Sequence, residues 1–437
     1  MKRWICLSLA MVLMVLAAGC SVGEPNGDAL VPGRDGLVPG RVAASELPRE
    51  TDPDVPDADL LALVEGNTAF ALALYNRLRA EEGNLIYSPH SISLALAMTY
   101  AGARGDTEAQ MAEVLRFDLA QEALHPAWNA LDLELAQRGE NVDPEEGTEF
   151  TLRLANALWG QYDYDFREAY LDLLAQYYGA GLRLVDYTSD PDAVRLEINR
   201  WVEEQTEDRI QDLLAEDSLD ELTRLVLVNA IYMNASWMMQ FPEGLTQDAP
   251  FYLPGDTEIQ VPMMRQVDRF RHTVTADYTA VELPYVGGEV AMLVIMPEDL
   301  DGFEGDLDSA TLQRIVADLE HGTVNLALPR FRAETSVALA ETLQAMGMTD
   351  AFVYQVADLS GMDGTRELFI DDVVHQAFIE VDEEGTEAAA ATAVIVATES
   401  APMEIVDITI DRPFLFGIRD RATGAILFWG RIVDPRG

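Results

Sequence analysis

Hydrophobic residues recur at helical spacing in the first half of the chain and form alternating or continuous runs in the second half. Apolar positions three and four apart predict helices, and short apolar runs bounded by turn residues predict strands. The predicted helices cover residues 59–80, 88–100, 107–115, 192–214 and 337–346. The predicted strands cover residues 85–87, 152–159, 225–234, 281–283, 290–296, 324–328, 373–381, 413–418 and 425–432. Because helices dominate early and strands dominate late, this order favours an α+β fold over an alternating α/β fold.

The first residues have the pattern of an export signal. Lys2 and Arg3 precede an apolar run at residues 4–16 that is too short for a comfortable membrane span. Residues 16–20, Leu-Ala-Ala-Gly-Cys, resemble the bacterial lipoprotein box, in which small residues precede a cysteine that receives lipid. We therefore expect a signal peptide over residues 1–19, a lipid anchor on Cys20 and a location outside the cytoplasm. The alternative is an ordinary signal peptide with an incidental Cys20, and secretion to the extracellular space.

Composition divides the rest of the chain into two parts. Residues 20–58 are rich in Pro, Gly, Asp and Glu and poor in aromatic residues, which predicts a disordered acidic linker. Residues 59–437 carry evenly spread hydrophobic positions and are long enough for one large domain or two ordinary ones.

The charge of the chain is strongly negative. It has 76 acidic residues against 29 basic ones, a formal net charge of −47, and Lys2 is its one lysine. Such a surface repels phosphate backbones, so nucleic acid is not an expected partner. A GC-rich genome and a salty habitat both explain the loss of lysine, and the sequence does not separate them.

Catalytic and metal-binding patterns are missing from the sequence. The two cysteines, Cys6 and Cys20, lie outside the predicted folded region, which excludes an internal disulfide framework and a thiolate nucleophile. There is no G-x-S-x-G motif, and the five histidines at positions 90, 125, 272, 321 and 375 lack metal-ligand spacing. We therefore expect neither an enzyme nor a cofactor or metal site.

An alanine-rich segment follows the predicted strand at 373–381. Read at the period of a strand, Thr386 and the alternate residues 388, 390, 392, 394 and 396 form one small, uncharged face. The charged Glu387 falls on the opposite face, so a slip of one residue would bury that charge. From the residues alone, the segment is either a flexible loop or surface helix, or a strand that can enter the interior of a sheet.

Several motifs in order along the chain resemble the serpin family. Residues 383–392 are similar to the hinge of inhibitory serpins: Glu383, Glu384, Gly385, Thr386, Glu387, Ala388, Ala389, Ala390, Ala391 and Thr392. Further similar segments lie at residues 84–92, 223–232 with Trp237, 261–264, 328–331, 357–362, 374–377, 411–416 and 427–431. The resemblance covers residues 59–437.

This resemblance implies a serpin domain over residues 59–437, with three β-sheets, about nine helices and an exposed reactive-centre loop in a metastable state. It implies a suicide substrate: a target serine protease, or possibly a cysteine protease, cleaves the loop, which then inserts into the main sheet and traps the covalent acyl-enzyme. The expected inhibitor is a monomer. By the same resemblance Ser88, Ser91, Asn229 and His375 form the shutter, where the sheet opens.

The resemblance also implies a breach at the top of the sheet, with Trp237 and with Arg330 paired to Glu383. Family spacing from Gly385 puts the reactive bond at Glu399–Ser400, whereas local similarity suggests Met403–Glu404. An alternative function stays open: a non-inhibitory binding or adhesion lipoprotein with the same fold, whose loop is only a protease substrate.

Overall fold

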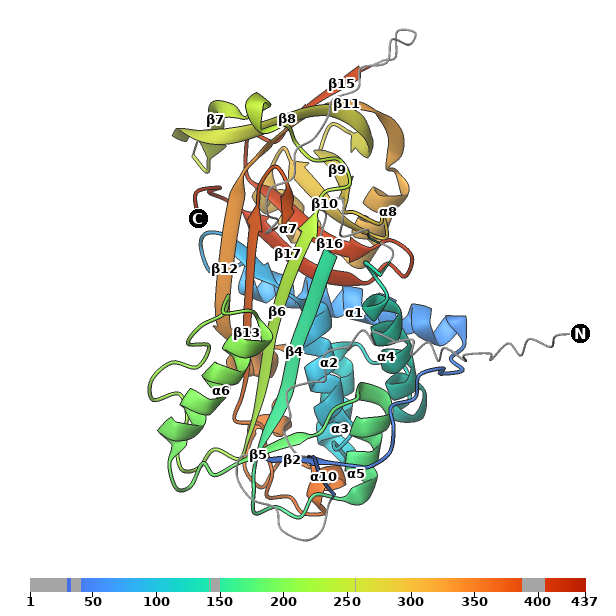
Figure 1. The fold of residues 1–437 in the computed structure, drawn as a ribbon, viewed down its shortest axis with the longest axis vertical. Coiled ribbons are helices and arrows are strands. Elements are labelled where there is room, and N and C mark those ends of the chain that lie inside the picture. The colour runs from blue at the N-terminus through green and yellow to red at the C-terminus, as the bar shows by residue number, and fades with distance from the viewer. Residues whose placement is uncertain (1–29, 33–40, 141, 143–149, 256, 387–404) are drawn as a thin grey trace, which may run out of the picture.

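The computed structural model describes residues 30–32, 41–140, 142, 150–255, 257–386 and 405–437 (Figure 1). One of its two hydrogen-bonded strand networks is an eight-stranded sheet with the order β1-β2-β5-β4-β6-β14-β13-β12. These strands are β1 (Leu30–Pro32), β2 (Arg41–Ala44), β5 (Leu182–Val185), β4 (Phe150–Gln161), β6 (Leu225–Ser236), β14 (Gly385–Thr386), β13 (Asp372–Val381) and β12 (Phe331–Ala338). The long strands β4, β6, β13 and β12 run side by side along the length of the molecule (Figure 1).

The remaining described strands form a second hydrogen-bonded network with the order β15-β11-β8-β9-β10-β16-β17-β3, and β7 pairs with β8. Its strands are β15 (Ile405–Thr409), β11 (Glu320–Pro329), β8 (Thr257–Val274), β9 (Tyr278–Pro284), β10 (Val290–Pro297), β16 (Phe414–Asp420), β17 (Ile426–Ile432), β3 (Leu85–Tyr87) and β7 (Gln247–Leu253). The long strand β8 pairs with β7 and β11 along most of its length and with β9 at its end. It thereby joins two sheets into one network.

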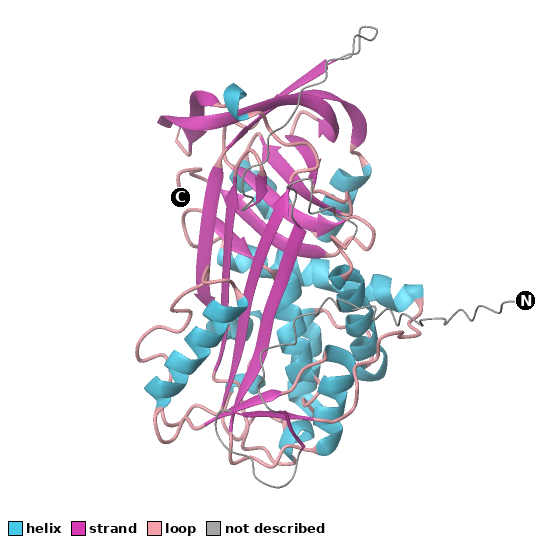
Figure 2. Cartoon of the chain, in the orientation of Figure 1, coloured by secondary structure: helices cyan, strands magenta, loops and turns pink. Residues whose placement is uncertain are grey.

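The helices lie mainly on one face of the eight-stranded sheet (Figure 2). They are α1 (Asp57–Leu78), α2 (Pro89–Tyr100), α3 (Gly105–Leu115), α4 (Gln121–Ala136), α5 (Glu168–Leu173), α6 (Pro191–Gln205), α7 (Leu300–Asp306), α8 (Ser309–Ala317), α9 (Ala340–Met346) and α10 (Ser360–Asp363). A π-turn at Leu174–Tyr178 and short 3₁₀ turns at Glu243–Leu245 and Asp350–Phe352 complete the set. The α+β prediction is therefore confirmed.

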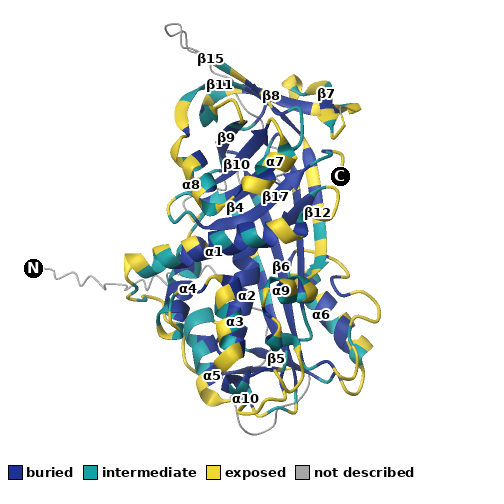
Figure 3. Cartoon of the chain, turned by 180° about the vertical axis from the view of Figure 1, so that it is seen from behind, coloured by how far each residue is buried: buried dark blue, intermediate teal, exposed yellow. Residues whose placement is uncertain are grey.

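Alternating residues of β6 face two different cores. Leu227 and Ile231 join the main core beneath α1 and α2, which shows as the dark interior of Figure 3. Val226, Val228 and Ala230 join a smaller core under α6, on the opposite face. The sheet is thus buried on both faces, which explains why β6 is a nearly continuous apolar run. Helix α1 is apolar and long enough to cross a membrane, yet about half of its most apolar window is buried within the domain.

The start of the folded region differs from the prediction. We expected a disordered linker up to residue 58, but strands β1 and β2 lie within it and the chain is described without a gap from residue 41 to residue 140. Strand β2 pairs with β5, and its residues Val42, Ala43 and Ala44 are buried. A Cβ on Gly181 would lie 2.6 Å from Val42, so the close approach of β2 needs a glycine there. The acidic, proline-rich composition gave no sign of these contacts, because β2 makes them with β5, which lies far away in the sequence.

Two predicted helices have different bounds in the structure. The helix expected at 192–214 ends at Gln205, and Glu207 and Asp208 adopt positive φ values of 53° and 62°. The helix expected at 337–346 begins at Ala340, because β12 continues to Ala338 through its pairing with β13. In both places hydrophobic residues keep their helical spacing beyond the residue where the backbone leaves the helix, so this spacing did not indicate the end of α6 or the start of α9.

Candidate functional site

The two central strands of the eight-stranded sheet, β6 and β13, pair directly with each other over only part of their length. Strands β6 and β13 pair in parallel, but only between residues 226–231 and 372–377. Beyond that point the short strand β14 lies between them, with Gly385 opposite Ser236 and Thr386 opposite Val381. The first residues of the alanine-rich segment therefore already occupy the gap between the two central strands.

The two residues of β14 suit this narrow position. A Cβ on Gly385 would lie 2.1 Å from the carbonyl oxygen of Ala235, so no larger residue fits without movement. Thr386 is buried at 1% exposure, and its hydroxyl lies 2.8 Å from the hydroxyl of Tyr285. This is the small face that strand periodicity identified in the sequence.

Trp237 lies directly beside the turn that precedes β14. Its indole stacks on the Tyr285 ring with centroids 4.5 Å apart and donates a hydrogen bond to the carbonyl of Asp382 at 3.0 Å. Its backbone N–H donates to the carbonyl of Glu384 at 2.8 Å. Trp237 thus holds the turn that delivers β14 into the sheet.

Arg330 and Glu383 form a bidentate ion pair next to this turn. Nε and Nη2 of Arg330 donate to the two carboxylate oxygens of Glu383 at 2.7 and 2.8 Å, and the Thr246 hydroxyl donates to the same carboxylate. The Glu383 side chain is 3% exposed and that of Arg330 is 46% exposed. Burial raises the pKa of Glu383, but the hydrogen bonds from Arg330 and Thr246 outweigh it and hold that pKa below its ordinary value.

The shutter residues form one buried hydrogen-bonded cluster on β6, β13 and α2. Ser88, Ser91, Asn229 and His375 are each fully buried. The amide nitrogen of Asn229 donates to Ser91 Oγ at 2.6 Å, and its amide oxygen bonds Nδ1 of His375. The backbone N–H of Ser88 donates to His375 Nε2 at 3.1 Å. Because Nε2 accepts, Nδ1 carries the proton and donates to Asn229.

The imidazole of His375 is neutral over the physiological range. Burial lowers its pKa to about 3, because the charged form loses its hydration in the interior. Ser88 also caps α2, because its hydroxyl accepts from the backbone N–H of Ser91 at 3.1 Å. The cluster therefore links the start of α2 to both central strands.

Asn156 belongs to this cluster and was missed by the sequence reasoning. It lies opposite Asn229 in the pairing of β4 with β6, while His375 lies opposite Asn229 on the other side. The carbonyl oxygen of Asn156 accepts from Ser91 Oγ at 2.8 Å and from the Asn229 amide. The available signal was an uncharged polar residue in the apolar second half of the predicted strand, between Ala155 and Ala157.

Other predicted site residues fall outside the described part of the chain. These are Glu387, Ala388, Ala389, Ala390 and Ala391 of the hinge, both candidate reactive bonds at Glu399–Ser400 and Met403–Glu404, and Cys20. Within the described residues, no group of three His, Cys, Asp or Glu side chains could hold a metal ion.

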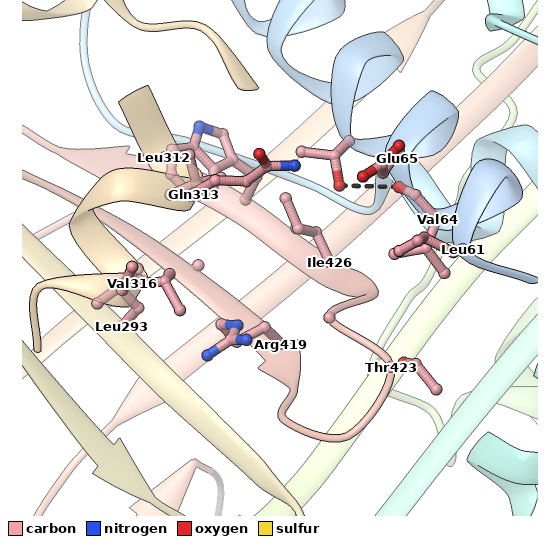
Figure 4. A pocket seen from close by; sticks show the side chains of 15 residues that line it. Leu61, Val64, Glu65, Leu293, Leu312, Gln313, Val316, Arg419, Thr423 and Ile426 are labelled. Atoms are coloured by element: carbon pink, nitrogen blue, oxygen red, sulfur yellow. Dashed lines mark hydrogen bonds between the residues drawn. The ribbon is translucent and has the colours of Figure 1, made fainter. Parts of the chain in front are cut away.

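A separate apolar cavity of about 250 Å³ lies between α1, α8 and the strands β10, β16 and β17 (Figure 4). Leu61, Val64 and Ile426 line it, and Arg419 reaches its edge. None of the shutter or breach residues lines this cavity.

Comparison with known proteins agrees with this geometry. The family model described as "Serpin (serine protease inhibitor)" matches residues 65–435. The chain is 41% identical over 379 residues to an uncharacterized serpin-like protein of Thermococcus kodakarensis, with 86% of each chain covered. It is 40% identical over 386 residues to leukocyte elastase inhibitor A of Rattus norvegicus, covering 85% of this chain and 99% of the relative. The structure of uncleaved ovalbumin matches with a TM-score of 0.75 and 29% identity, over 86% of this chain and 100% of ovalbumin.

The chain therefore belongs to the serpin family. The predicted family and fold are confirmed, and the family assignment supports a protease inhibitor rather than an enzyme.

Proposed function

We propose that this serpin inhibits a serine protease as a suicide substrate. The protease's serine attacks a carbonyl in the loop, forms an ester with it and expels the amine of the following residue as a new N-terminus. The freed upstream segment then inserts between β6 and β13 and carries the acylated protease with it, before water hydrolyses the ester. The target protease supplies all of the catalytic groups.

The observation that supports this proposal is the position of β14 between β6 and β13. Its register continues without a shift if further residues follow Thr386 into the gap. In that register Thr392 would lie opposite both Asn229 and His375, on the same buried face as Thr386. Insertion would then separate Asn229 from His375, and the Thr392 hydroxyl would stand between them as a replacement partner.

The same register suggests where the inserted strand would end. Val396 would lie opposite Leu225, the first residue of β6. About ten new backbone hydrogen bonds would form, each contributing ~0.5–1.5 kcal/mol, and they would replace a short parallel pairing between β6 and β13. The bond Glu399–Ser400 would lie just beyond the end of the strand, which favours it over Met403–Glu404.

The test is to mix the protein with a panel of serine proteases and look for complexes that survive SDS. The matched variants are Ala388→Arg and Ala389→Arg, which place the same charge on the inward and outward faces of the inserting strand. We expect the inward Ala388→Arg variant to be cleaved without forming a complex, and the outward Ala389→Arg variant to keep inhibiting. If the two variants form the SDS-resistant complex to the same extent, the proposed register, in which residue 388 faces inward and residue 389 outward, is refuted.

The other outcome of this panel concerns the alternative function. Cleavage without any stable complex across a broad panel would favour a binding or adhesion module whose loop is only a substrate.

We further propose that the protein is exported and anchored by lipid on Cys20. Radiolabelled fatty acid should label the wild-type protein and fail to label a Cys20→Ser variant.

A further inference from the structure

A second cavity, of about 400 Å³, opens beside the breach between β8, β9 and β11. Its lining combines arginine and histidine side chains with methionine, phenylalanine and proline. Two of its residues, Met238 and Met239, directly follow Trp237 in the chain. It is distinct from the apolar cavity beneath α1 and α8.

Positive charge exceeds negative charge at one wall of this cavity. Glu282, whose side chain is 2% exposed, is bonded by Arg271 at 3.1 Å, Arg419 at 2.9 Å and Arg421 at 3.2 Å. One carboxylate thus faces three guanidinium groups. The pKa of Arg419 is lowered, first by burial and then by the neighbouring Arg271 and Arg421, which together outweigh the attraction of Glu282.

Nearby acidic side chains do not remove this excess. Asp420 precedes Arg421 in the chain, and Glu289 accepts the backbone N–H of Arg421 through its carbonyl oxygen. The carboxylates of both are held by Arg138, at 2.6 and 3.6 Å. A local surplus of positive charge is unusual in a protein with a net charge of −47. It creates a site where an anion is attracted rather than repelled.

Arg269 provides a donor group without a protein partner. It is exposed at the mouth of the cavity, and among the described residues no acceptor lies within bonding distance of its guanidinium. His321 lies on the neighbouring strand β11, opposite Arg271 in the register. Arg271 lies on the same face of β8, two residues further on. Its guanidinium is already bonded to Glu282 and to the carbonyls of Val316 and Leu319, so it adds positive charge beside Arg269 rather than a free donor. A guanidinium group can donate two parallel hydrogen bonds to two oxygens of one phosphate or carboxylate.

The rest of the lining is apolar. Met238 is 44% exposed, and Phe270 and Pro284 form the adjoining wall. The backbone N–H of Met238 donates to the carbonyl of Pro284 at 2.9 Å, which fixes this wall beside Trp237. Methionine side chains adapt to varied ligand shapes. The cavity therefore offers a cationic end and an apolar end.

We propose that this cavity binds a small organic oxyanion with a short apolar body. Its phosphate or carboxylate group bonds Arg269 and is attracted by the charges of Arg271 and Arg421, and its hydrocarbon part lies against Met238 and Pro284. Nothing in this proposal depends on loop insertion or on protease inhibition.

The test is isothermal titration calorimetry of the full chain with octyl phosphate at fixed ionic strength. The variants are Arg269→Gln and, as matched control, Arg265→Gln. Arg265 is exposed on the same face of β8 but outside the cavity, so each variant removes one positive charge from a similar strand position. We expect Arg269→Gln to weaken binding about tenfold or more, the scale of a lost hydrogen bond to a charged group. Arg265→Gln should leave the dissociation constant within about twofold.

Two further ligands separate the parts of the site. Inorganic phosphate should bind more weakly than octyl phosphate and remain sensitive to Arg269→Gln, whereas octanol should show no dependence on Arg269. The proposal is overturned if octyl phosphate does not bind at millimolar concentration. It is equally overturned if the Arg269 and Arg265 variants weaken binding by the same factor, since that result reflects net charge alone.

Discussion

Replacing Arg330 by glutamine is expected to destabilise the native chain more than replacing Glu383 by glutamine. The two residues form one bidentate ion pair at the breach, but their surroundings differ. The Arg330 side chain is 46% exposed, whereas the Glu383 side chain is 3% exposed. The cost of each substitution therefore depends on the charge that it leaves behind.

The expected magnitudes follow from this difference. Arg330→Gln leaves the Glu383 carboxylate buried with the Thr246 hydroxyl as its remaining side-chain donor. Stranding a buried charge costs ~3–5 kcal/mol. Glu383→Gln leaves Arg330, which water can solvate again, so the loss is that of charged hydrogen bonds, ~1.5 kcal/mol. We expect the free energies of unfolding to differ by about 1.5–3.5 kcal/mol.

Urea titrations followed by tryptophan fluorescence measure both losses, and pH provides a second check. The pKa of Glu383 is lowered in the native chain, so the pair contributes stability above the ordinary carboxyl pKa of 4.5 and loses it as pH falls through the lowered value. Without Arg330 the buried carboxylate takes up a proton more readily, so the deficit of Arg330→Gln should shrink on acidification. A larger loss for Glu383→Gln than for Arg330→Gln at pH 7 would refute this account of the breach.

Three further predictions concern the central strands. Asn229→Leu leaves several buried polar groups without a partner, at a cost of ~1–3 kcal/mol each, and should therefore speed polymerisation on warming, measured on native gels. An unchanged polymerisation rate and an unchanged urea midpoint would count against the shutter cluster. His375 has a pKa of about 3 in the folded chain and 6.5 ordinarily, so stability should fall as pH drops from 6.5 toward 3, because only the unfolded imidazole takes up a proton. His375→Gln should flatten that slope by up to about 1.4 kcal/mol per pH unit, and an unchanged slope would contradict the burial of a neutral imidazole. Gly385→Ala would push a Cβ into the backbone of β6 and should speed hydrogen exchange at the Trp237 amide. The control Gly305→Ala, whose new Cβ meets open space, should not change that exchange rate. Equal exchange rates in the two variants would contradict the close packing of β14 against β6.

The apolar strands and the main helices could be predicted from the sequence because their patterns are local. The strand predicted at 225–234 is β6, which ends two residues later at Ser236. The hinge segment was marked by its small alternate residues, and Thr386 lies on the buried face as expected. These features need only periodicity and side-chain size.

Features that depend on distant partners could not be predicted in this way. Strand β2 is ordered because β5 offers a free edge, and that edge exists only in the folded chain. Asn156 joins the shutter because three strands bring it level with Asn229 and His375. Helix α4 carries a proline, Pro126, within its first two turns, and β8 alternates polar and apolar residues weakly, so neither stood out from its sequence.

The most direct test of loop insertion is a crystal structure of the chain after cleavage in the reactive-centre loop. We predict that the segment following Thr386 lies antiparallel between β6 and β13, with Thr392 between Asn229 and His375 and with the parallel pairing of residues 226–231 to 372–377 lost. A cleaved chain that keeps this parallel pairing and the Asn229–His375 hydrogen bond, with the segment outside the sheet, would contradict the proposed mechanism.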